Sequence, residues 1–165
     1  MCRLIRSVRR SRWIPQGNTP VLPEFVENAS ADLTPRPSDN GGLSVYQIHD
    51  DPPDQAEEHL TAALHVVLTR KPLTVHFLRI QPACIRDLDL EIRHEFSTDQ
   101  HPYLQHRHRN IYGITPEISR QIAHSILSGD PYVLTITEGE IRQQGRRLLD
   151  SMDFAGHIAF PEAYR

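Results

Sequence analysis

Histidine and arginine side chains are concentrated between residues 97 and 114, a stretch that the sequence predicts to be a long loop. Connections of more than about 12–15 residues without regular structure are uncommon unless they carry function. The side chains in or just before this stretch that can bind or titrate are His94, Asp99, His101, His106, Arg107, His108, Arg109 and Asn110. Tyr103 and Tyr112 lie among them. Three kinds of function fit these residue types: metal catalysis, RNA binding and protein binding.

A metal site is one interpretation. On an extended chain His106 and His108 point to the same side, as two metal ligands must. His94 or Asp99 would supply a third ligand and leave a position for an activated water, as in a metal-dependent hydrolase or nuclease. Zinc or manganese accepts such ligands. The competing interpretation is an exposed polar loop, because this spacing often arises by chance in a chain with 10 histidines.

RNA binding is a second interpretation. Arg107 and Arg109 offer forked donors for phosphate, and Tyr103 and Tyr112 offer rings for base stacking. The charge of the chain weighs against it. Five of the 18 Lys and Arg residues precede the first of the 21 acidic residues, so the remainder of the chain is acidic. Binding to phosphates needs clustered positive charge, and we therefore expect a broad nucleic-acid surface to be absent.

The favoured hypothesis is a non-enzymatic accessory or regulatory subunit of a bacterial complex, of the immunity, antitoxin or defence-operon type. Tyrosine, tryptophan and arginine are the residues that dominate protein interfaces. The predicted contact residues are Trp13, Tyr103, Arg107, Arg109 and Tyr112. Such a subunit would bind a protein encoded nearby and would need no cofactor.

The remaining nucleophiles and the bulk composition exclude several classes. Ser44 lacks the glycine-flanked turn of a nucleophile elbow. The chain contains 2 cysteines, which is typical of the reducing cytoplasm. It has no run of about 20 apolar residues, so no membrane span is expected.

Hydrophobic periodicity and turn residues place the regular elements. The predicted strands are Leu43–Ile48, Leu73–Ile80, Leu88–Phe96, Tyr132–Ile136 and His157–Phe160. Residues 88–96 alternate between apolar and charged, which would point His94 inward. Helices are predicted after three N-terminal caps: Asp54 with Glu57, Thr115 with Pro116, and Thr137 with Glu140.

The element order predicts an α+β fold. We expect a two-layer sandwich with a mixed or antiparallel sheet of about four or five strands and about three helices. Residues 43–165 would form this single domain. Residues 1–42 carry five early arginines and several prolines, and we expect them to form a basic, irregular N-terminal lead-in.

Overall fold

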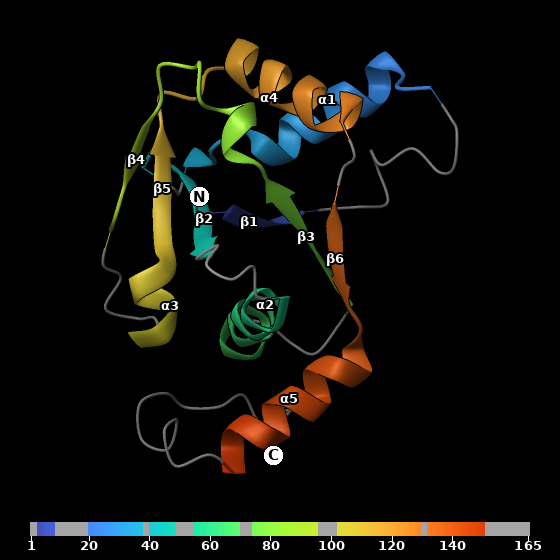
Figure 1. Cartoon of the computed structure of the whole chain (residues 1–165), viewed down its shortest axis with the longest axis vertical. Helices are drawn as coiled ribbons and strands as arrows, with labels where there is room; N and C mark the ends of the chain where they lie inside the picture. Colours follow the sequence, from blue (N-terminus) through green and yellow to red (C-terminus); the bar gives the residue numbers. More distant parts are fainter. Residues whose placement is uncertain are drawn as a thin grey trace.

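A six-stranded antiparallel sheet forms the centre of the molecule, with strand order β4-β5-β2-β1-β3-β6 (Figure 1). The computed structural model describes residues 3–8, 20–37, 40–48, 55–69, 74–95, 102–129 and 132–150. The strands are β1 (Arg3–Val8), β2 (Leu43–Ile48), β3 (Val75–Ile80), β4 (Glu91–Arg93), β5 (His108–Tyr112) and β6 (Val133–Ile136). The α-helices are α1 (Pro23–Leu33), α2 (Gln55–Thr69), α3 (Pro102–Arg107), α4 (Pro116–Ser128) and α5 (Glu138–Asp150). The predicted α+β class is confirmed, although the described residues form more strands and helices than predicted.

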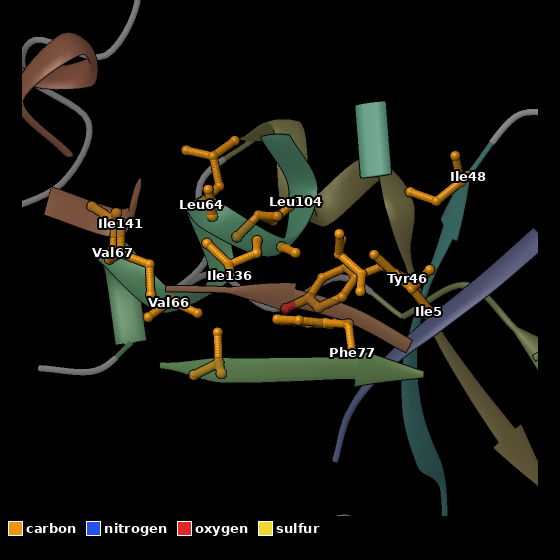
Figure 2. Packing of buried hydrophobic residues seen from close by; sticks show 14 residues of the cluster. Ile5, Tyr46, Ile48, Leu64, Val66, Val67, Phe77, Leu104, Ile136 and Ile141 are labelled. Atoms are coloured by element: carbon orange, nitrogen blue, oxygen red, sulfur yellow. The ribbon is translucent and has the colours of Figure 1, made fainter. Parts of the chain in front are cut away.

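Helices cover both faces of the sheet, so the predicted two-layer arrangement is wrong. Successive side chains of a strand point to opposite faces, and those of β1 enter two separate cores. Ile5 belongs to the core that also contains Leu64 of α2 and Phe77 of β3 (Figure 2). Leu4 packs with Leu33 of α1 and with residues of α4. The molecule therefore has three layers, with α1 and α4 on one face and α2 on the other.

The N-terminal residues that were expected to be irregular form a central strand. β1 lies between β2 and β3, and Ile5 is opposite Tyr46 on one side and Arg79 on the other. Residues 23–33 form helix α1, which packs in the same core as α4. The prediction failed because the early arginines suggested an exposed arm. Arg6 is instead buried, donating to the Asp32 carbonyl at 2.9 Å and the Ser44 carbonyl at 2.6 Å.

A buried ion pair attaches α2 to the sheet. The Glu58 side chain is 1% exposed and accepts hydrogen bonds from Nε and Nη2 of Arg79 at 2.9 and 2.7 Å. Arg3 Nη1 lies 3.5 Å from the same carboxylate. The Arg79 guanidinium also stacks over the Tyr132 ring, 3.8 Å from its centroid. A buried charge is tolerated only when it is paired, so these contacts depend on one another.

The starts of α4 and α5 follow the predicted capping residues. The Thr115 hydroxyl accepts a hydrogen bond from the Ile118 amide at 3.3 Å. The Thr137 amide donates to the Glu140 carboxylate at 2.8 Å, and the Glu140 amide donates to the Thr137 hydroxyl at 3.3 Å. Both caps are confirmed. The predicted Asp54 cap and the strand at residues 157–160 lie outside the described residues.

Residues 88–96 were predicted to form one long strand with an inward-facing histidine. The strand here, β4, covers only Glu91–Arg93, and both Ile92 and His94 are exposed. The inward orientation was wrong because β4 is the last strand of the sheet among the described residues, so less of the chain covers it. No helix in the described part of the chain is both long and apolar enough to cross a bilayer.

The buried ion pair gives a first testable prediction. Glu58→Gln is expected to lower the free energy of unfolding by about 3 kcal/mol or more, because it leaves the Arg79 charge buried without its partner. The control is Glu27→Gln, whose partner is Arg120 and whose side chain is 59% exposed. Exposed pairs contribute about 1 kcal/mol or less. Urea denaturation measures both variants, and equal losses would contradict the role of Glu58.

Candidate functional site

The histidine-rich stretch is largely part of the fold, so the predicted loop is wrong over residues 102–112. Pro102 begins α3, which is a favourable position for proline. Leu104 is 1% exposed and packs in the core beneath α2, which holds the short helix in place. Residues 108–112 then form β5, with Ile111 opposite Leu43 of β2. Residues 96–101 lie outside the described part.

Two of the predicted contact residues, Tyr103 and Arg107, serve an internal contact. The Arg107 guanidinium stacks over the Tyr103 ring, 3.7 Å from its centroid. Arg107 Nη2 also lies 2.7 Å from a Glu57 carboxylate oxygen. These contacts join α3 to α2, so both side chains stabilise the fold.

The other predicted contact residues do not gather with this pair. Arg109 and Tyr112 lie on opposite faces of β5, because they are three residues apart on a strand. Arg109 Nη1 donates to the carbonyls of His106 and His108 at 2.9 and 2.7 Å. Trp13 lies outside the described residues.

The predicted metal ligands are separated by the boundary between α3 and β5. His106 is exposed on the helix, whereas His108 is buried on the strand, so they do not form the extended pair that was expected. His94 lies at hydrogen-bond distance from the Gln105 carbonyl, with its Nε2 at 2.9 Å. Within the described ranges, no three His, Cys, Asp or Glu residues are placed to hold a metal ion. Asp99 lies outside these ranges.

A hydrogen-bonded group of polar side chains lies at the β4 edge of the sheet. We call it the sheet-edge cluster, and its members are Ser44, Arg93, Glu95, His108, Asn110 and Tyr112. The Glu95 carboxylate accepts a hydrogen bond from Asn110 Nδ2 at 2.6 Å and another from the Tyr112 hydroxyl. The Arg93 guanidinium stacks over the Tyr112 ring, 4.9 Å from its centroid.

The absence of a side chain at Gly42 leaves space for Asn110 and Tyr112 of the cluster. A Cβ atom at this position would lie 2.9 Å from Asn110 Cβ and 3.0 Å from Tyr112 Cζ. Such distances are shorter than ordinary carbon–carbon contacts of about 3.5–4.0 Å. A side chain at residue 42 would therefore displace Asn110 and Tyr112 from Glu95.

The hydrogen bonds of the cluster shift the ionisation of its members. The hydrogen bond from Tyr112, assisted by the one from Asn110 and by the nearby Arg93 guanidinium, lowers the pKa of Glu95 against the opposing effect of desolvation. The same bond to Glu95 raises the pKa of Tyr112. At neutral pH the cluster therefore holds an ionised carboxylate against a protonated phenol. Groups with shifted pKa values gather preferentially at functional sites.

Ser44 and His108 form a second contact within the cluster. Ser44 Oγ lies 2.8 Å from His108 Nε2, and His108 Nδ1 lies 3.3 Å from the Glu95 carbonyl oxygen. Burial lowers the pKa of His108, so its ring is neutral at pH 7. With the proton on Nδ1, the ring donates to the backbone carbonyl of Glu95, and its Nε2 accepts from the Ser44 hydroxyl. A serine, a neutral histidine and a group that orients it can serve in nucleophilic catalysis.

A structural role accounts for the same geometry. Ser44 is opposite Asn110, one step from His108 on the same face of the sheet, and such diagonal neighbours commonly interact. The pair satisfies polar atoms between β2 and β5 and fixes the carbonyl of Glu95. The sequence around Ser44 carries no nucleophile motif. Only the pairing of β2 with β5 places Ser44 against His108.

The buried histidine gives a prediction about pH. Because the pKa of His108 is lowered on folding, the unfolded chain binds a proton at higher pH than the folded chain. The contribution of the neutral His108 ring to the free energy of unfolding is therefore at its full value above about pH 6.5, and it decreases below that pH. His108→Asn should flatten the fall in unfolding free energy between about pH 7.5 and about pH 5.5. The control His124→Asn, on the exposed side of α4, should keep the wild-type slope. A wild-type slope in His108→Asn would contradict the burial effect.

Comparison with protein-family models, curated proteins and solved structures finds no match to this chain.

Proposed function

We propose that this chain is an accessory or regulatory subunit that binds another protein through the sheet-edge cluster. The observation that carries the proposal is the stacked pair of Arg93 and Tyr112, which Glu95 and Asn110 hold in place. Arginine and tyrosine are enriched among the residues that contribute most to protein binding. Side chains that are already ordered lose less conformational entropy when a partner binds.

The exposure of the cluster supports a contact role. The Arg93 side chain is 54% exposed and the Tyr112 side chain is half-buried. Tyr112 is one of the contact residues predicted from the sequence, and the exposed Arg93 guanidinium stacks over its ring. We propose a partner protein encoded nearby in a bacterial genome, as for an immunity, antitoxin or defence-operon subunit of the cytoplasm.

The two alternatives have less support. A zinc or manganese hydrolase needs about three protein ligands around one point. Of the predicted ligands, His94 follows β4, His106 is on α3 and His108 is on β5, and no three candidate ligands converge in the described ranges. RNA binding would use Arg107 and Arg109 for phosphate contact. Arg107 is paired with Glu57, and Arg109 donates to two backbone carbonyls.

The test is capture of the partner from an extract of the native host by crosslinking to the purified chain. Tyr112→Ala should reduce the captured protein about tenfold or more, because it removes both the aromatic ring and the hydroxyl held by Glu95. Tyr112→Phe keeps the ring and should retain most of the capture. Arg120→Ala removes an exposed arginine from α4, outside the cluster, and should have no effect.

Circular dichroism and urea denaturation check that each variant is folded. Equal capture by the wild type, Tyr112→Ala and Arg120→Ala would contradict the proposed surface. Failure to capture any protein with the wild type would contradict the proposed function.

A further inference from the structure

We infer that two copies of this chain associate through strand β4, which pairs antiparallel with β4 of the second copy around Ile92. The inference goes beyond the proposed function, because it concerns the backbone edge of β4 and names a second copy as its occupant. It is carried by the position of β4 in the sheet and by the order of its side chains. Arg93 belongs both to the sheet-edge cluster and to the edge of β4, so exchanging it with Glu91 affects the two surfaces differently.

β4 is the last strand of the sheet in the described part of the chain. It pairs with β5 on one side, with Ile92 opposite Ile111. No described strand lies on its other side (Figure 1). All of its residues are exposed. The backbone N–H and C=O groups of an edge strand are a template for a further strand. The side chains of β4 determine which strand can pair with this edge.

The charges of β4 are complementary to those of a second β4. In an antiparallel pair centred on Ile92, Glu91 is opposite Arg93 of the second copy, and the two-fold axis repeats the contact. Opposite charges directly across two strands stabilise the pair, and like charges there destabilise it. Within one copy, Arg93 Nη2 already lies 2.5 Å from Glu91 Oε2, so both charges are on one face of the strand, as the pairing requires.

The apolar residue of β4 fits the same arrangement. Ile92 is 46% exposed, and it is one of two large hydrophobic residues that are exposed in the described part of the chain. It lies on the opposite face from Glu91 and Arg93, since side chains alternate along a strand. In the two-fold pair, Ile92 meets Ile92 of the second copy and both lose exposed apolar area. A two-fold contact of this kind uses the edge of both copies and closes as a dimer.

The experiment measures the dissociation constant of the full chain by sedimentation equilibrium over a concentration series. The wild type should dimerise. Glu91→Arg places arginine opposite Arg93 twice in the dimer and should raise the dissociation constant about tenfold. The double variant Glu91→Arg/Arg93→Glu exchanges the charges, restores both pairs and should return the constant to within about threefold of the wild type.

The matched control is Glu27→Arg, which makes the same change of charge on α1 and should leave the constant unchanged. A monomeric wild type, a double variant as weak as Glu91→Arg, or an equal loss in Glu27→Arg would overturn the inference. A monomer that still loses the captured protein on Tyr112→Ala would leave the proposed function standing. Conversely, Glu91→Arg/Arg93→Glu could dimerise like the wild type and yet capture less of the partner protein from the host extract. That result would show that the dimer contact and partner binding use different groups.

Discussion

The structure depends on the burial of β1 on both of its faces. Leu4 and Ile5 are 4% and 2% exposed, yet they pack into different cores. The two arginines of the strand connect it to both helical layers, with Arg3 near Glu58 of α2 and Arg6 donating to the last turn of α1. Six residues near the N-terminus therefore hold the sheet and both layers together.

The central place of β1 determines where the candidate site lies. With β2 and β3 on either side of β1, β5 and β4 form one end of the sheet. A strand at that end has fewer neighbours to cover its side chains. The polar groups there satisfy one another instead, and Glu95 accepts hydrogen bonds from Asn110 and Tyr112. The result is an ordered, partly exposed surface, which is the kind of surface that a partner can bind with little loss of entropy.

Local rules predicted the elements whose start is determined by neighbouring residues. The helix caps at Thr115 and Thr137 and the strand at residues 43–48 are of this kind. β1 was missed because the alternation rule describes a strand with one exposed face, whereas β1 buries apolar side chains on both faces between its arginines. Its buried Arg6 is satisfied by carbonyls of Asp32 and Ser44, and no local pattern reveals partners that distant. The same limit applies to the cluster, in which composition indicated Tyr112 and only strand pairing supplied Glu95 and Ser44.

Amide hydrogen exchange of β1 tests the account most directly. If β1 is the central strand, the amides of Leu4, Ile5 and Arg6 exchange only on global unfolding, as slowly as the amide of Phe77 in β3. Fast exchange of these three amides, in a chain whose β3 amides remain protected, would show that the sheet forms without β1. That result would contradict the arrangement from which the edge position of β4 and β5 follows.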